Sequence, residues 1–182
     1  GANPFVLTGS MNWSGNGFLH TAITVNVSGQ SIMDSETPAY FNNLLHKYGL
    51  TAPDIDLEIS EEAAMQHFDT SLQTLTTLRQ MGISCWMDDF GQAYSSLSRL
   101  RNLPVEVIKI PTQFIRHAEE NRAILKAIID MSHALHLRVC AEGVETQKQA
   151  ALLDELDCDL LQGYLFAPPL PVPEIEKLLS VH

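Results

Sequence analysis

The stretch Cys85-Trp86-Met87-Asp88-Asp89-Phe90-Gly91 decides how the chain can fold. An apolar run of this length is typical of a buried strand, and it leads directly into two adjacent carboxylates and a glycine. Buried carboxylates placed side by side repel each other unless a cation or a proton lies between them. The stretch therefore indicates a metal site at the carboxyl end of a parallel sheet. An alternative stays open at this point: one aspartate caps the next helix and the other faces water.

The composition is that of a globular domain of ordinary apolar content. The chain has 182 residues, of which 45% are hydrophobic and 18% charged, enough for one domain with a core. No apolar run approaches the roughly 20 residues that a membrane span needs, so we expect no membrane segment. The chain carries 22 acidic and 11 basic residues and a net charge of -11. This balance argues against binding of a DNA or RNA polymer, although a nucleotide ligand held through cations is compatible with it.

Strand-like and helix-like stretches alternate along the chain. Strands are predicted to begin near residues 22, 55, 83, 105, 137 and 159, and the clearest helical patterns cover Pro38–Tyr48, Asp69–Met81, Ser95–Asn102, Asn121–His136, Thr146–Leu156 and Pro171–Leu179. Such alternation is typical of βα units with a parallel sheet. Residues 1–20 show neither periodicity, and we expect them to be an irregular segment that precedes a barrel domain over residues 21–182.

A polar residue stands at the carboxyl end of each predicted strand. In order these residues are Asn26, Glu58, Asp88 with Asp89, Lys109, Glu142 and Gln162. A single polar residue at a strand end is usually a helix cap, but the active site of a parallel barrel is built from the ends of several strands. Polar residues at six strand ends out of six favour a functional site over a coincidence of caps.

Seven motifs in this frame resemble the EAL domain family, bacterial phosphodiesterases of the second messenger cyclic di-GMP. The motifs are Glu58-Ile59-Ser60-Glu61, Asp88-Asp89-Phe90-Gly91, Tyr94-Ser95-Ser96-Leu97, Leu103-Pro104-Val105, Lys109-Ile110, Ala141-Glu142-Gly143-Val144-Glu145-Thr146 and Gln162-Gly163-Tyr164. They occur in the order and at the spacing of the family over roughly residues 22–170. The resemblance implies an α/β fold of the TIM type, a (β/α)8 barrel that is incomplete here, with about six βα units present and the first units missing.

The resemblance also implies a role for each residue at the strand ends. Asn26, Glu58 and Asp88 would bind one Mg²⁺ or Mn²⁺, and Asp88 would bridge to a second ion held by Asp89. Lys109 and Glu142 would be catalytic, orienting and deprotonating the attacking water. Glu61 would brace the loop of residues 90–96, and Glu145 and Gln162 would complete the network around water and metal. Oxygen ligands suit hard divalent ions, and two such ions promote phosphodiester hydrolysis.

The sequence departs from the family pattern at four points. It contains neither the Glu-Ala-Leu signature, whose glutamate is a metal ligand, nor the arginine that follows it. Ala93 stands at a loop position where the family usually has glycine, and Pro111 stands where it usually has aspartate. We therefore expect weak or lost turnover in a lineage of cyclic di-GMP phosphodiesterases.

Two further expectations concern partners and location. The alternative to an enzyme is a non-catalytic EAL-like module that binds the dinucleotide or a protein. An open barrel exposes strand edges and apolar surface, which predicts a homodimer or a higher homo-oligomer. The three buried-looking cysteines, without metal-type spacing, and the absence of a signal pattern at the start of the sequence predict the bacterial cytoplasm as its location.

Overall fold

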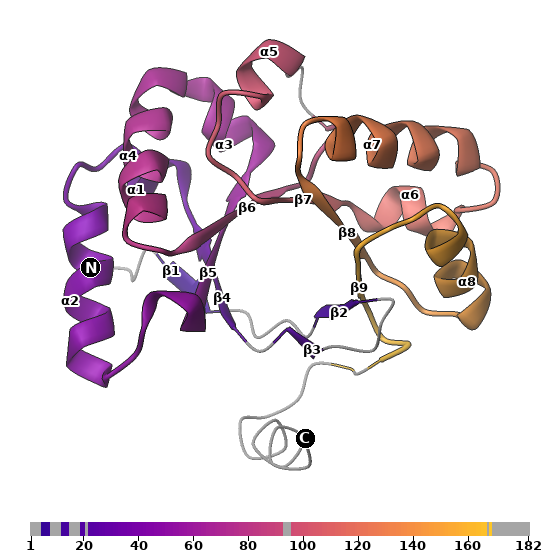
Figure 1. Ribbon diagram of the computed structural model, residues 1–182, viewed down its shortest axis with the longest axis horizontal. Helices are drawn as coiled ribbons and strands as arrows, with labels where there is room; N and C mark the ends of the chain where they lie inside the picture. The colour runs from indigo at the N-terminus through magenta and orange to yellow at the C-terminus, as the bar shows by residue number, and fades with distance from the viewer. Residues whose placement is uncertain are drawn as a thin grey trace.

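In a computed structural model, the structure describes residues 5–7, 12–14, 19–20, 22–92, 96–166 and 168. Six parallel strands lie side by side in chain order: β4 (Ile23–Val27), β5 (Ile55–Ser60), β6 (Ser84–Asp88), β7 (Val107–Ile110), β8 (Arg138–Glu142) and β9 (Leu160–Gln162). Figure 1 shows that they curve into an arc with the helices outside it. The strands thus form a half-barrel, which confirms the predicted incomplete TIM-type α/β fold.

The helices that connect the strands follow the predicted pattern closely. The predicted helices with apolar periodicity are α2 (Thr37–Tyr48), α4 (Phe68–Gln80), α7 (Arg122–Ala134) and α8 (Gln147–Glu155), and the short α5 (Leu97–Leu100), which ends before Pro104, was also predicted. Three others were not predicted, α1 (Gly29–Ile32), α3 (Glu61–Gln66) and α6 (Thr112–Arg116), because none is longer than 6 residues and so short a helix shows no periodicity. A short 3-10 turn, η1 (Ala52–Asp54), precedes β5. The helix predicted at Pro171–Leu179 lies outside the described residues.

The expectation that residues 1–20 are irregular is wrong for three segments. These are the short strands β1 (Phe5–Leu7), β2 (Asn12–Ser14) and β3 (Leu19–His20). β1 pairs antiparallel with β4 at one end of the sheet, and β2 pairs antiparallel with β9 at the other and with β3. A sheet edge offers unpaired backbone groups, and these can recruit a segment that lacks strand periodicity of its own. The domain boundary at residue 20 stays a prediction.

Apolar side chains cover both faces of the sheet, as expected for parallel strands. The outward residues of β4 to β6 pack against α2 and α4 around Phe41, Leu57 and Leu78. The outward residues of β7 to β9 pack with α6, α7 and α8 around Leu125, Val139 and Leu153. A third cluster, the floor cluster, lies on the inner face and consists of Trp86, Val107, Cys140 and Leu160.

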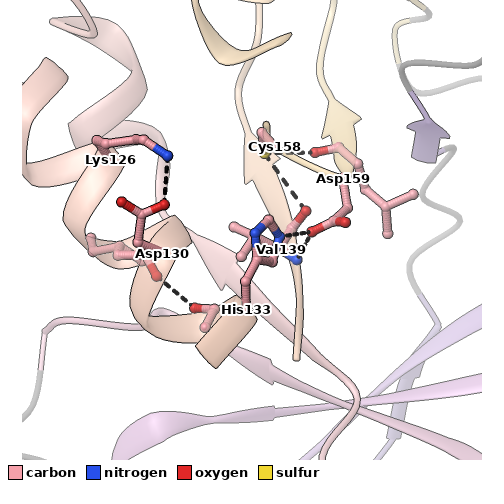
Figure 2. Close-up of polar contacts among 9 residues, drawn as sticks. Lys126, Asp130, His133, Val139, Cys158 and Asp159 are labelled. Atoms are coloured by element: carbon pink, nitrogen blue, oxygen red, sulfur yellow. Dashed lines mark hydrogen bonds and ion pairs between the residues drawn. The ribbon is translucent and has the colours of Figure 1, made fainter. Parts of the chain in front are cut away.

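The Asp159 side chain links α7 to the starts of β8 and β9. Figure 2 shows Asp159 between the two strands: its Oδ2 accepts a hydrogen bond from the Val139 N–H at 2.8 Å and lies 2.8 Å from Nε2 of His133 on α7. His133 therefore helps to dock its helix. All three cysteines are buried as thiols. Among the described residues, no helix has the length and apolarity that crossing a membrane requires.

Candidate functional site

The polar residues at the strand ends share the inner face of the half-barrel. Strand register aligns Asn26 with Glu58, and Glu142 with Gln162, while Lys109 aligns with Cys140 of the floor cluster. Because side chains alternate along a strand and registered neighbours share a face, all of these point inward. We call this set the polar layer: Asn26, Glu58, Asp88, Lys109, Glu142 and Gln162. In each of β6 to β9, the residue of the floor cluster stands two positions before the residue of the polar layer.

Lys109 connects carboxylates from three other strands. Its Nζ lies 2.5 Å from Glu142 Oε1 on β8, 2.7 Å from Glu58 Oε1 on β5 and 3.7 Å from Asp88 Oδ1 on β6. The side chains of Lys109 and Glu58 are each only 3% exposed, whereas Asp88 and Glu142 keep about a fifth of their surface, 23% and 20%. The structure thus brings together four of the residues predicted from the strand ends.

Burial and charge act in opposite directions on this cluster. Loss of solvation raises the pKa of Glu58 and of Glu142 above the usual value, and Lys109 opposes that rise in both. Burial alone would lower the pKa of Lys109, but the carboxylates of Glu142, Glu58 and Asp88 together outweigh it and raise the pKa. The ammonium is therefore charged at neutral pH, and its charge limits the rise in the pKa of both poorly solvated carboxylates.

Asp89 lies in a sharp turn after the end of β6. Its φ is +56°, and its backbone N–H donates to Asp88 Oδ1 at 2.9 Å. Asp89 Oδ1 accepts a hydrogen bond from Gln92 Nε2 at 2.7 Å, and burial, followed by the charge of Asp88, raises its pKa. The turn carries Asp89 beyond the end of β6, and its role toward a second ion stays a prediction.

Glu61 contacts the loop that it was predicted to brace. Its Oε2 accepts a hydrogen bond from the Gly91 N–H at 2.8 Å, and the residue is 2% exposed at the start of α3. This contact fixes the first part of the loop relative to β5. Ala93, whose backbone conformation bears on the predicted departure from the family, lies outside the described residues.

Glu145 and Gln162 are placed differently from each other. Gln162 lies beside Glu142 in register, and its Oε1 is buried without a hydrogen-bond partner among the described residues. Glu145 lies in the exposed turn before α8, where its N–H donates to Gln149 Oε1 at 2.9 Å. The structure brings the Gln162 amide to the polar layer, but among the described contacts it does not bring the Glu145 carboxylate there.

Helix capping does not explain the polar layer. The helices that follow β4, β5 and β8 have Ser28, Ser60 and Thr146 at their N-caps, and each of these side chains accepts a hydrogen bond from its helix. The N-cap of α6 after β7 is Pro111, and the N-cap of α5 after β6 is Ser96. At the ends of β4 to β8, the N-cap residue of the next described helix is therefore a different residue from the one in the polar layer. The polar layer does not cap these helices.

The donor set of this layer suits a hard divalent cation. Asn26, Glu58, Asp88 and Gln162 offer oxygen atoms, the ligands that Mg²⁺ and Mn²⁺ prefer. Glu58 Oε1 is in ion-pair contact with Lys109 but, within the described residues, receives no well-aligned hydrogen bond, and Gln162 Oε1 receives none. In the described part of the chain, no three Asp, Glu, His or Cys side chains converge as a ready-made metal site. These oxygen donors are suitable ligands for a divalent cation, but in this structure the Lys109 ammonium contacts two of them, Glu58 and Asp88.

Sequence reasoning missed two contacts around the site. The first is the hydrogen bond that Gln92 donates to Asp89. The second is the packing of Thr112 on α6 against Gly143, which is so close that a Cβ at that glycine would lie 2.4 Å from Thr112 Cγ2. Gly143 also has a φ of +70°, which favours glycine. The signal for Gly143 was its place directly after Glu142, where the chain must turn away from the strand end.

With this geometry established, comparison with known proteins defines the class. Residues 6–169 match the EAL domain family, so the chain belongs to the EAL domain family. It is 38% identical over 179 residues to the cyclic di-GMP phosphodiesterase NbdA of Pseudomonas aeruginosa, a match that covers 95% of this chain and 22% of NbdA. The chain spans about a fifth of the length of the curated relatives that it matches first.

Two solved structures show the same fold. The phosphodiesterase PaMucR in complex with cyclic di-GMP superposes with a TM-score of 0.85 at 25% identity, over 94% of each chain. The manganese and cyclic di-GMP complex of Klebsiella pneumoniae BlrP1 superposes with a TM-score of 0.74 at 28% identity, over 81% of this chain and 39% of that one.

Proposed function

We propose that the polar layer is a site for metal-dependent hydrolysis of cyclic di-GMP to linear pGpG. The observation that carries this proposal is the contact of the Lys109 ammonium with the carboxylates of Glu58, Asp88 and Glu142. The relative NbdA is a cyclic di-GMP phosphodiesterase, PaMucR binds cyclic di-GMP, and BlrP1 binds it together with manganese. These comparisons support the same ligand for this chain.

The proposed metal ligands follow the inner face of the first three parallel strands. Asn26, Glu58 and Asp88 would hold one Mg²⁺ or Mn²⁺, and Asp89 would hold a second ion. A divalent cation there supplies a Lewis acid that activates water and offsets the charge of the phosphodiester. The chain's own part is to present oxygen donors from three neighbouring strands at one end of the sheet.

Lys109 and Glu142 are proposed to handle the proton of the attacking water. Burial raises the pKa of Glu142, which makes its carboxylate a stronger base than an exposed glutamate. The Lys109 ammonium, 2.5 Å from Glu142 Oε1, fixes that carboxylate and opposes the rise in its pKa. Gln162, and in the sequence-based proposal Glu145, would complete the network, while Glu61 fixes the loop after Asp89.

Calorimetry and a hydrolysis assay test this function. We expect cyclic di-GMP to bind in the presence of Mn²⁺, with slow or no conversion to pGpG by these 182 residues alone, because the Glu-Ala-Leu glutamate and its arginine are not among them. Asp88→Ala should abolish any conversion, while Asp130→Ala, a change at an exposed aspartate of α7, should leave it unaltered. Absence of dinucleotide binding with Mn²⁺ present would contradict the proposal. Slow conversion would support hydrolysis at this site, and binding without any turnover would mean that these 182 residues act as the non-catalytic module.

We also propose that the chain forms a homo-oligomer and acts in the bacterial cytoplasm. The sheet ends in two short antiparallel strands, β1 at one end and β3 at the other, and neither pairs further within the described residues. Such edges can pair with a second copy. Light scattering should give a mass at least twice that of one chain, 20.2 kDa. A monomeric mass at micromolar concentration would refute the oligomer.

A further inference from the structure

Lys109 reaches further across the sheet than its place in the sequence suggests. Its strand, β7, is separated from β5 by β6, and adjacent strands lie about 4.8 Å apart, so Glu58 stands roughly 10 Å away across the sheet. The ammonium nevertheless lies 2.7 Å from Glu58 Oε1 and also contacts Glu142 on the other neighbour, β8. A nearly extended lysine side chain is needed for such a span.

The charge of this cluster is only partly balanced. Three carboxylates surround one ammonium, which leaves a formal charge of -2 when all are ionised. Beneath them lies the apolar floor cluster, where carboxylates find no compensation. Without the ammonium, the repulsion among these carboxylates would be uncompensated, and a divalent cation would remove the same imbalance.

Lys109 contacts Glu58 and Asp88, which are also two of the proposed ligands of the metal. We propose that Lys109 is an exchangeable internal counter-ion, which holds Glu58 and Asp88 in the metal-free protein and yields them to the divalent cation. Its contact with Glu142 persists, because Glu142 is on the adjacent strand and is not a proposed metal ligand. This inference rests on the proposed function, since it requires a metal at Glu58 and Asp88.

An exchangeable counter-ion affects metal affinity, whereas a lysine with a purely structural role does not. Lys109 supports the fold when metal is absent and opposes metal entry, because two cations compete for the same carboxylates. Lys109→Met should therefore bind Mn²⁺ about tenfold more tightly than the unchanged protein in calorimetry with MnCl₂ alone. Lys148→Met, which removes a lysine that is 79% exposed, should bind Mn²⁺ as the unchanged protein does.

Thermal unfolding supplies the second half of the test. In chelator, Lys109→Met should melt several degrees below the unchanged protein, and saturating MnCl₂ should close most of that gap. Equal or weaker Mn²⁺ binding by Lys109→Met would overturn the counter-ion role and leave the metal site standing. Absence of Mn²⁺ binding by both proteins would overturn the metal-dependent function and this inference together.

A measurement on the unchanged protein decides the matter if Lys109→Met does not fold. With ¹⁵N-labelled lysine, the buried Lys109 ammonium should give a distinct nitrogen resonance in chelator, and MgCl₂ should shift it as contact with Glu58 is lost. The Lys148 resonance serves as the internal control. A Lys109 resonance that stays in place at saturating Mg²⁺ would overturn the inference.

Discussion

Replacing Trp86 by alanine is expected to lower the free energy of unfolding by about 4 kcal/mol. Trp86 has no exposed surface and is the largest member of the floor cluster, where it packs with Val107, Cys140 and Leu160. Its indole Nε1 also donates a hydrogen bond to Ser84 Oγ at 3.0 Å. Truncation leaves a cavity on the inner face and removes a partly buried hydrogen bond. A domain of this size is stable by about 5–15 kcal/mol, so the loss is a large part of the total.

Urea unfolding followed by circular dichroism measures this loss without relying on tryptophan fluorescence. Trp86→Phe is the matched control, because it keeps most of the packed volume and removes only the Nε1 donor. We expect it to cost about 1–2 kcal/mol. An alanine variant no less stable than the phenylalanine variant would show that the floor cluster is not a packed core.

Replacing Gly163 by alanine is expected to cost about 3 kcal/mol and to disturb the polar layer. A Cβ at Gly163 would lie 2.2 Å from the Val144 carbonyl oxygen and 2.3 Å from the Val144 nitrogen, and backbone atoms cannot rotate away. The same two atoms of Val144 bond to the Gln162 carbonyl and to the Leu165 N–H, each at 3.0 Å. Relief of the clash therefore has to break the turn that positions Gln162.

Gly49→Ala provides the comparison for Gly163→Ala. Gly49 ends α2 with a φ of +66°, and a Cβ there would meet no atom within 4 Å, so only the backbone preference is lost. That preference is worth about 1 kcal/mol. Both variants are measured by urea unfolding, and Mn²⁺ affinity by calorimetry. Equal losses of stability in the two variants would contradict the steric argument at Gly163.

Local patterns predicted the parallel strands and the longer helices of the fold. The run from Cys85 to Met87 and the helix ending before Gly82 depend on neighbours in the sequence, and they appear where expected. The strands β1, β2 and β3 could not be found in this way, since β1 pairs with the edge of β4, β2 pairs with the edge of β9, and β3 pairs with β2. A pairing partner far along the chain leaves no periodicity in the segment that it recruits.

The sequence predicted which residues form the candidate site, but not which of them contact each other. The rule that parallel strands end on one side of a sheet places Glu58, Asp88 and Glu142 together. Nothing in the sequence shows that Lys109 crosses β6 to reach Glu58, because that contact depends on how the sheet curves. The turn at Asp89, with its positive φ, is likewise a property of the folded loop.

The division of the barrel interior into two layers bears on how such a domain evolves. The floor cluster carries packing energy, and the polar layer, two positions further along each strand, carries the charged groups. A mutation in the upper layer can change or remove the chemistry while the lower layer still holds the strands together. Selection can therefore act on catalysis and on folding through different positions of the same strands. A descendant that has lost its reaction can persist as a folded domain and acquire another use.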